Sequence, residues 1–467
     1  MSLRPSLPAP VNAIAETIAQ RGGRTVLVGG LVRDMLLGAP SKDVDLEIYG
    51  LTLAELEVVL AGFGEVIQVG RAFGVLRVKG LDVDFSIPRR DSKTGRGHRG
   101  FIVDLDPGLT FAEAARRRDL TINSLGLDVL SHELLDPHGG QADLEAGRLR
   151  ATDAGQFSED PLRGLRVAQF AARFEMAPDA ELHALSAALD LTELPVERIW
   201  GEMLKLLAKG RRPSFGFDFL RSTGLIRFFP ELEALIGVPQ DPQWHPEGPV
   251  WEHTLMVLDE AAKDVSDDAE ADLIVRFGAL CHDLGKPAVT VREDGRVRSP
   301  DHEAQGVAPT ESFMARIGAP GALTMQVSCI VRHHLAPAHF AGTAKDRGFR
   351  RLARKLQAGG INPELLYRVA RADCFGRTTD AALARRFPAG DAFLERMQSL
   401  QLADRPVVDV VQGRHLIARG MQPGPHFREF LDACRDVQDD TGWSDPDRIL
   451  DQVLMTAVSA EKEDRAQ

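Results

Sequence analysis

Residues 28–34 read Val28-Gly29-Gly30-Leu31-Val32-Arg33-Asp34, and Asp43-Val44-Asp45 begins ten residues after Arg33. A short apolar run leads into the glycine turn, a helix-like segment follows, and a second apolar strand carries the two acids. Residues two apart in a strand share a face, so Asp43 and Asp45 should both point toward the turn. Paired carboxylates repel each other unless a cation lies between them, and Mg²⁺ prefers carboxylate and phosphate oxygens. Because the backbone N–H groups of such a turn suit phosphate, the pattern predicts a site that joins a nucleoside triphosphate to an acceptor.

The whole chain indicates a multidomain cytoplasmic protein. Its 467 residues are too many for one core, so about three or four units are expected. It has no secretory signal and no apolar run of about 18 residues, which predicts no membrane span. The cysteines form no C-x-x-C pair and are interpreted as reduced thiols. They are Cys281, Cys329, Cys374 and Cys434.

Two basic segments stand out in a chain of net charge −12. Arg89 to Arg118 holds eight Lys/Arg and four Asp/Glu, and Lys345 to Arg386 holds eleven and four. The overall charge argues weakly against a nucleic-acid partner, but local charge matters more than the total. Each segment is either a track for a phosphate backbone or a solvated helix face, and the sequence leaves both interpretations open.

The distribution of strands and helices predicts an α+β unit followed by helices. From about residue 24 to 135, short apolar strands alternate with glycine turns and the helical patterns Leu53–Ala61 and Phe111–Arg117. After about residue 155 the pattern is helical nearly throughout, with Pro and Gly at the joints. The expected strands are Thr25–Val28, Val44–Tyr49, Val66–Val69, Val75–Lys79, Val83–Ile87 and Leu125–Val129.

A second motif runs from Arg117 to Asn123, with the sequence Arg-Arg-Asp-Leu-Thr-Ile-Asn. The planar guanidinium of arginine bonds oxyanions at two points, which suits a triphosphate. Asn123 is a candidate for holding a sugar hydroxyl. Taken alone, the motif would be better interpreted as an amphipathic segment with a structural Asn.

A third motif, Glu159-Asp160-Pro161-Leu162-Arg163, opens a helix. Asp160 and Arg163 are three residues apart and should share a face. A carboxylate acceptor beside a guanidinium, which presents two fixed donors, suits hydrogen bonding to the edge of a nucleotide base. The commoner meaning of this spacing is a surface ion pair.

In this order and spacing, the motifs resemble those of the class II tRNA nucleotidyltransferases, the CCA-adding enzymes, whose core bacterial poly(A) polymerases share. The resemblance implies a polymerase-β-like nucleotidyltransferase head in which Asp43 and Asp45 are catalytic and hold Mg²⁺. It also implies a flexible loop over Arg89 to Asp106. Many relatives have a further Arg where this chain has Gln169, which puts a phosphate contact there in doubt.

The resemblance further implies roles for individual residues toward CTP, ATP and tRNA. Asn123 would contact the sugar, Arg166 the triphosphate, and Asp160 with Arg163 would act as a protein template for the base. The complete set of implied nucleotide-binding residues is Gly30, Arg33, Arg118, Asn123, Asp160, Arg163 and Arg166.

The second half resembles an HD phosphohydrolase domain, with Leu280-Cys281-His282-Asp283-Leu284-Gly285-Lys286 at its core. Imidazole and carboxylate groups together bind a divalent transition metal that activates water. The resemblance implies phosphatase or 2′,3′-cyclic phosphodiesterase activity. The best candidate ligands are His253, His282, Asp283 and Asp373. Further candidates, among which the sequence does not choose, are His302, His333 and His334.

The expected organisation has four parts: a nucleotidyltransferase head (1–150), a helical neck that selects nucleotides and binds tRNA (151–237), an HD domain (238–385) and a helical tail (386–467). The expected activity is template-independent addition of CMP, CMP and AMP to tRNA. Alternatives are a poly(A) polymerase, an enzyme that adds only CC or only A, and an HD hydrolase whose head binds nucleotide without catalysis.

Overall fold

A computed structural model describes residues 5–464, apart from residues 6, 41–42, 70–73, 94–100, 341, 343 and 404. The chain divides into two compact units, Met1–Phe229 and Pro230–Gln467, and each is described by itself. Within the described residues, no helix has the length and apolar character that crossing a membrane requires. The four-part organisation expected from the sequence stays a prediction.

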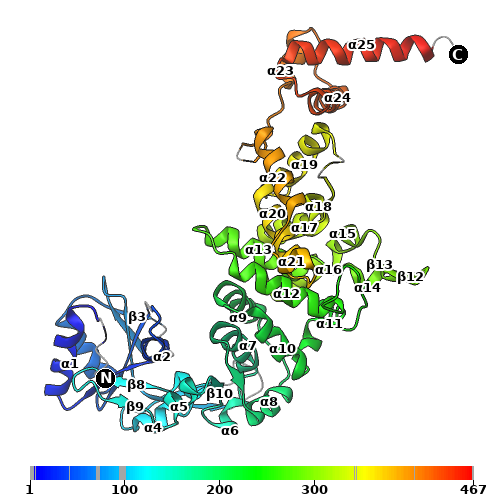
Figure 1. The fold of residues 1–467 in the computed structure, drawn as a ribbon. Coiled ribbons are helices and arrows are strands. Elements are labelled where there is room, and N and C mark those ends of the chain that lie inside the picture. Colours follow the sequence, from blue (N-terminus) through cyan, green and yellow to red (C-terminus); the bar gives the residue numbers. More distant parts are fainter. Residues whose placement is uncertain are drawn as a thin grey trace. The chain divides into compact units, whose positions relative to one another are not determined.

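The first unit begins with a seven-stranded mixed sheet in the order β3-β4-β5-β2-β1-β8-β9 (Figure 1). Helices α1 (Pro10–Gln20) and α3 (Leu53–Ala61) pack on each other and on the sheet. The buried apolar side chains of α1 and of the central strands form the core. The strands are β1 (Arg24–Val28), β2 (Val44–Tyr49), β3 (Val66–Val69), β4 (Val75–Val78), β5 (Val83–Ser86), β8 (Gly126–Asp128) and β9 (Leu134–Leu135).

The register of the central strands positions the site. Strand β1 is antiparallel to β2 and pairs Val28 with Asp45. Strand β2 is parallel to β5 and pairs Asp45 with Asp84. Strands β2 and β3 have their expected bounds, whereas β1, β4, β5 and β8 differ by one residue at one or both ends. The strand pattern therefore confirms the expected α+β head.

A separate antiparallel hairpin, β6 (Arg89–Lys93) and β7 (Phe101–Leu105), lies in the segment that was expected to be a flexible loop. The β6 sequence is charged and has no apolar alternation, so sequence patterning missed it. The apolar run of β7 was missed because it lies in the segment interpreted as a loop. The part of the expected loop between the strands, residues 94–100, lies outside the described residues.

Helices complete the first unit. Helix α2 (Gly30–Leu36) follows β1, and α4 (Phe111–Ala115) follows β7. Short elements lead onward, and α7 (Leu162–Phe174) then packs against α9 (Val196–Lys209) and α10 (Pro213–Ser222). The short elements are η1 (Thr121–Asn123), α5 (Gly140–Glu145), β10 (Arg148–Leu149), α6 (Ala154–Phe157), β11 (Ala177–Pro178), α8 (Ala180–Ala187) and η2 (Leu225–Phe228).

In the described residues of the second unit, the regular elements are helices apart from the small hairpin β12 (Val291–Glu293) and β13 (Arg296–Arg298). Four helices pack around the histidine cluster described below: α12 (Val250–Lys263), α13 (Ala269–Cys281), α17 (Gly321–His333) and α20 (Pro363–Phe375). The others are α11 (Pro230–Glu233), α14 (Lys286–Val289), α15 (His302–Gln305), α16 (Val307–Ile317), α18 (Ala336–Phe340), α19 (Asp346–Ala358), α21 (Asp380–Leu383), α22 (Pro388–Ser399), α23 (Gly413–Ala418), α24 (His426–Thr441) and α25 (Pro446–Asp464).

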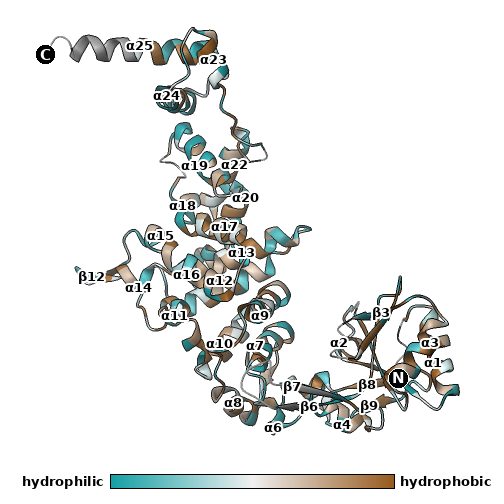
Figure 2. Cartoon of the chain, turned by 180° about the vertical axis from the view of Figure 1, so that it is seen from behind, coloured by the Kyte–Doolittle hydropathy of each residue, from teal (hydrophilic) through white to brown (hydrophobic). Residues whose placement is uncertain are grey.

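Part of the second basic segment forms ion pairs within the chain. Figure 2 shows hydrophilic residues along α19 and α24, which pack together. Arg354 Nε donates to Asp439 at 2.9 Å, and Arg351 Nη2 donates to Asp440 at 3.2 Å. Arg351 and Arg354 are therefore paired within the chain, and the interpretation of the segment as a whole stays open.

Candidate functional site

The glycine turn and the acidic strand meet as expected. Gly29 has φ 79°, a left-handed conformation that favours glycine, and α2 begins at the next residue. A Cβ atom on Gly29 would lie 3.4 Å from Oδ2 of Asp45. The carboxylate of Asp45 therefore faces the turn.

Three carboxylates belong to this edge of the sheet. Asp43 comes immediately before β2 and is exposed, and Asp84 is the partner of Asp45 across the parallel pair. Asp84 also accepts a hydrogen bond from Arg77 Nη2 at 3.0 Å. Partial desolvation by the surrounding protein raises the pKa of Asp45, and repulsion from Asp84 and Asp43 raises it further, while Arg118 opposes the shift. Three hard oxygen donors whose charges repel one another fit a Mg²⁺ site.

Glu47 continues the row of acids on β2 and positions two arginines. It is 1% exposed and accepts from Arg117 Nη2 at 3.1 Å and from the Tyr49 hydroxyl at 2.6 Å. Arg118 Nη2 lies 3.5 Å from Glu47 Oε2, the oxygen that also accepts from the Tyr49 hydroxyl. Burial alone would raise the pKa of Glu47, but Arg118 and Arg117 together lower it below its ordinary value. Glu47 thus holds both guanidinium groups beside Asp45.

Arg33 lies at the start of a buried polar chain and is not a surface charge. It is 4% exposed, and its Nε and Nη2 donate to Asp34 Oδ1 at 2.9 and 2.7 Å. It also donates to Asn123, whose Nδ2 donates to Asp119 at 2.9 Å. Asp119 accepts in turn from Arg166 Nε at 2.6 Å. Both ends of the Asn123 amide are therefore engaged within the protein.

Asp160 and Arg163 do not form the ordinary surface ion pair with each other. Arg198 of α9 donates to Asp160 Oδ2 at 2.8 Å. Arg163 donates to the carbonyl oxygens of Gln156 at 2.8 Å and Arg117 at 2.6 Å. Each side chain is thus held in place by a different partner.

These groups converge on one pocket of about 610 Å³ in the first unit. It contains Asp45, whereas Asp43 is not among its lining residues. Its wall also includes Asp84, Arg173 and Gln169. The structure brings all seven implied nucleotide-binding residues to this pocket: Gly30, Arg33, Arg118, Asn123, Asp160, Arg163 and Arg166.

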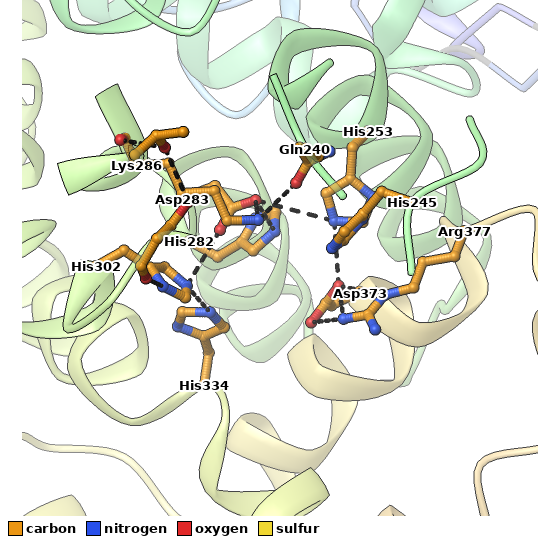
Figure 3. A network of polar contacts seen from close by, with 12 residues as sticks. Gln240, His245, His253, His282, Asp283, Lys286, His302, His334, Asp373 and Arg377 are labelled. Atoms are coloured by element: carbon orange, nitrogen blue, oxygen red, sulfur yellow. Dashed lines mark hydrogen bonds and ion pairs between the residues drawn. The ribbon is translucent and has the colours of Figure 1, made fainter. Parts of the chain in front are cut away.

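A second cluster lies in the other unit and consists mainly of histidines (Figure 3). His253 comes from α12, His282 and Asp283 from the end of α13, and Asp373 from α20. His253 Nε2 is 3.1 Å from Asp373 Oδ1, and His282 Nε2 is 3.2 Å from Asp283 Oδ2. The four best candidates from the sequence therefore lie together.

His302 and His334 extend this cluster, whereas His333 does not. His302 Nε2 is 3.4 Å from Asp283 Oδ1 and 3.3 Å from His334 Nε2. His333 instead lines another pocket, with Cys329 and Lys355. Successive side chains on a helix diverge by about 100°, so adjacent histidines face different ways. Among the residues expected from the sequence, two groups result: His253, His282 and Asp373 form one, and Asp283, His302 and His334 form the other. A third group, His245, Glu247 and His253, shares His253 with the first.

The ring orientations fit metal coordination. Nδ1 of His282, His302 and His334 lies 2.8, 2.9 and 2.8 Å from a backbone carbonyl oxygen of Ala279, Ser299 and Val331, respectively. A ring that donates through Nδ1 keeps its Nε2 lone pair for a metal. The donor set therefore fits a divalent transition metal.

Two cations balance the buried carboxylates of this cluster. Lys286 Nζ is 2.7 Å from Asp283 Oδ2, and Arg377 Nη2 is 2.8 Å from Asp373 Oδ1. Burial alone would raise the pKa of Asp283, but His282 and Lys286 hold it well below its ordinary value. Asp373 is likewise ionised, since Arg377 overcomes the effect of burial on its pKa.

Comparison with known proteins identifies the family. The chain is 36% identical over 420 residues to the multifunctional CCA protein of Xanthomonas campestris pv. campestris (strain B100), covering 88% of this chain and 96% of that one. The chain belongs to the multifunctional CCA protein family. A second relative, from Xylella fastidiosa (strain 9a5c), is 39% identical over 319 residues, covering 67% and 74% of the two chains.

Domain profiles and solved structures agree with this family. The Poly A polymerase head domain matches residues 25–150, and the probable RNA and SrmB-binding site of polymerase A matches residues 173–236. The fold resembles that of the Bacillus stearothermophilus CCA-adding enzyme in complex with CTP. That likeness has a TM-score of 0.66 and 22% identity, and it covers 98% of this chain and 100% of the other. At this identity, it concerns the fold alone.

Sequence reasoning missed three acidic residues that line the first pocket: Glu47, Asp84 and Asp119. Two of them had a local signal. Glu47 is two residues beyond Asp45, and Asp84 occupies the same place in Val83-Asp84-Phe85 as Asp45 does in Val44-Asp45-Leu46. Asp119 lies inside the second motif, but its link to Arg166 needs a fold that brings α7 to it.

Proposed function

We propose that the protein adds CMP, CMP and then AMP to the 3′ end of tRNA, using CTP and ATP. The observation that carries this proposal is the single pocket that joins the acidic strand edge, a wall of arginines and the Asp160/Arg163 pair. The names of the relatives support the same reaction. A cytoplasmic location goes with this proposal.

Asp43, Asp45 and Asp84 would hold Mg²⁺, which when bound supplies activation of the 3′-hydroxyl and charge stabilisation during displacement of pyrophosphate. Arg33, Arg118 and Arg166 bind the triphosphate in this proposal. Their guanidinium groups are held by buried partners, so little reorganisation accompanies nucleotide binding.

Asp160 and Arg163 select the base. Cytosine and adenine both present an amino donor next to a ring-nitrogen acceptor, which matches a carboxylate beside a guanidinium. Uracil and guanine present a carbonyl and a ring N–H instead, and they would leave buried polar groups unpaired. The same pair of side chains can therefore accept both required bases and reject the other two.

The test is incorporation by the purified protein with Mg²⁺, using tRNA transcripts that lack one, two or three nucleotides of CCA. CTP and ATP are supplied separately and together. Complete CCA followed by a stop supports the proposal. Addition of C alone or A alone indicates a partial enzyme, and long A runs on any RNA indicate a poly(A) polymerase. Absence of incorporation indicates a non-catalytic head.

The buried cluster of the second unit supports a further activity, metal-dependent phosphohydrolysis. His253, His282, Asp283 and Asp373 would hold a divalent transition metal, with His302 and His334 as additional ligands. The metal, when bound, supplies an activated water. Lys286 and Arg377 already lie beside the carboxylates, where they also suit a phosphate ester.

This second proposal is tested with 2′,3′-cyclic AMP and a phosphate monoester in the presence of Mn²⁺, Co²⁺ or Ni²⁺. Hydrolysis that disappears in His282→Ala supports the assignment. Hydrolysis that persists in that variant, or its absence with every metal, contradicts it.

A further inference from the structure

One tryptophan differs from the others in its exposure. Trp244 lies in a stretch without helix or strand that precedes α12, and it is 59% exposed, whereas Trp251 is 1% exposed and the remaining two are half-buried. An indole presents a large, flat apolar face that another ring can cover by stacking. Whether the exposed ring of Trp244 is positioned for a ligand depends on what fixes its backbone and on what lies beside it.

The loop that carries Trp244, residues 240–248, is held at both ends. Gln240 Oε1 accepts from Lys286 Nζ at 2.7 Å, and Gln240 Nε2 donates to the carbonyl oxygen of Gly248 at 3.1 Å. Between these anchors, the backbone N–H of Trp244 donates to the carbonyl oxygen of Asp241 at 3.1 Å and closes a tight turn. Because these contacts order the backbone in the free protein, a ligand that binds Trp244 has little loop entropy to overcome.

The same loop lies against the histidine cluster. His245 follows Trp244 directly, and its ring centroid is 4.6 Å from that of His253. The lysine that anchors the other end of the loop, Lys286, is also 2.7 Å from Asp283 Oδ2. Figure 3 shows these cluster side chains around one centre. Trp244 is therefore one residue away from a side chain that contacts the cluster, on a loop that the cluster holds from two directions.

The charges beside the cluster suit the phosphate of a nucleotide whose base could reach Trp244. Lys286 and Arg377 lie next to the buried carboxylates, where they suit a phosphate ester. Consecutive Cα atoms are about 3.8 Å apart, so the Trp244 side chain begins close to His245. It can meet a base that a ribose joins to a phosphate at the cluster.

We propose that the indole of Trp244 stacks on the base of a nucleotide whose phosphate lies at the histidine cluster. This inference rests on the proposed phosphohydrolase function and deepens it, because it makes the substrate a nucleotide phosphate and not any phosphate ester. Every base has a π-face, so stacking on one aromatic ring tolerates purines and pyrimidines alike. The site therefore distinguishes esters that carry a base from esters that do not.

The proposal is tested with matched cyclic phosphodiesters, in the presence of the transition metal that supports hydrolysis by the wild-type protein. 2′,3′-Cyclic AMP and 2′,3′-cyclic CMP carry a base, and glycerol 1,2-cyclic phosphate has the same cyclic diester without one. In Trp244→Ala, the KM for both nucleotides should rise by about fivefold or more, the loss expected for one stacked base, while kcat changes little. The kcat/KM for the glycerol ester should not change.

Binding is measured independently of hydrolysis by tryptophan fluorescence. A base stacked on an indole quenches its emission, so 2′-AMP, a product of ring opening, should quench the wild-type protein. Trp244→Phe keeps an aromatic ring, so its KM values should stay close to those of the wild type while the quenching disappears. Leu383→Ala changes a side chain of α21 that is 70% exposed, and as the control it should alter neither the KM values nor the quenching.

The outcomes separate this inference from the function on which it rests. If the wild-type protein hydrolyses the cyclic nucleotides but Trp244→Ala leaves both KM values unchanged, the stacking is refuted and the hydrolase function stands. An equal loss for the glycerol ester also overturns the stacking, since that result indicates a structural role of the loop. Quenching without any hydrolysis, lost in Trp244→Phe, upholds the base contact and refutes the hydrolase. If the wild-type protein shows neither hydrolysis nor quenching, both proposals fail.

Discussion

The two sites differ in how much of their metal environment the protein itself supplies. At the sheet edge, Asp43 and Asp45 are exposed, and Asp45 lines an open pocket. In the second unit, Asp283 is 1% exposed and His282 is fully buried, among further imidazoles. The first arrangement suits a hard cation that shares its coordination with substrate phosphates and water. The second suits a softer metal that stays bound between reactions.

This difference has a functional consequence. Where triphosphate oxygens supply some of the metal ligands, metal binding is linked to substrate binding, and the cation is expected to bind together with the nucleotide. A buried protein cage binds its metal before substrate, and its affinity depends on ring orientation and on outer hydrogen bonds. If the two sites are separate, a substitution at either one should leave the reaction of the other intact.

The largest expected effect comes from Asp45→Ala. It removes a carboxylate from the sheet edge, and we expect nucleotide addition to fall by about 10³-fold or more, equivalent to about 4 kcal/mol of transition-state stabilisation. Hydrolysis of 2′,3′-cyclic AMP and the circular dichroism spectrum should stay unchanged. Equal loss of both activities would argue against two separate sites.

Asp283→Asn should have the reverse effect. Its two oxygens face different histidine groups, so the change weakens both groups at once. We expect loss of hydrolysis and of bound transition metal, measured by mass spectrometry of the dialysed protein, with nucleotide addition retained. Full metal content in this variant would show that the ligands lie elsewhere.

A smaller effect is expected at Glu247, which supports the second cluster from outside. Its side chain is 1% exposed, and its Oε1 lies 2.8 Å from His253 Nδ1 and 2.9 Å from His245 Nδ1. Glu247→Gln should lower metal affinity by about 10- to 100-fold, as is typical when an outer hydrogen bond to a ligand is lost. Titration with Co²⁺, followed by visible absorption, measures this. Glu270→Gln, at an exposed position of α13, is the control, and an equal effect there would contradict the interpretation.

The smallest effect concerns the contact between α19 and α24. Arg354→Gln removes the guanidinium that donates to Asp439. It should destabilise the contact between the helices by about 1–3 kcal/mol, and the loss should be larger at low salt, where ion pairs are less screened. Amide hydrogen exchange in α24 measures the change. Arg396→Gln, which breaks a more exposed pair with Asp346, should have an effect below about 1 kcal/mol. Unchanged exchange in Arg354→Gln would indicate that apolar contacts alone hold the tail.

The sequence predicted the local elements of the head well, because apolar alternation between glycine turns is a local signal. Strand β2 has its expected bounds, and Asp45 faces the turn as expected. The partnership of Asp45 with Asp84 was missed because it depends on a parallel strand pairing that local pattern does not reveal. The burial of Arg33 likewise depends on α7, more than a hundred residues away.

For the second cluster, the sequence predicted which residues come together better than it predicted the full extent of the group, and their role as metal ligands stays a prediction. His253, His282, Asp283 and Asp373 come together from three helices, as the resemblance implied. The choice among His302, His333 and His334 depends on the rotation of α17 about its axis and on the place of α15. The structure brings His302 and His334 to the cluster, and their role as ligands stays a prediction.

The comparison between the two sites is tested most directly by returning metals one at a time to the same sample. The protein is stripped with a strong chelator, and both reactions are measured after Mg²⁺ alone and then after Mg²⁺ with a transition metal. We predict that Mg²⁺ alone restores nucleotide addition and that hydrolysis returns only with the transition metal. Recovery of both reactions with Mg²⁺ alone, or of neither until the transition metal is added, would contradict the account.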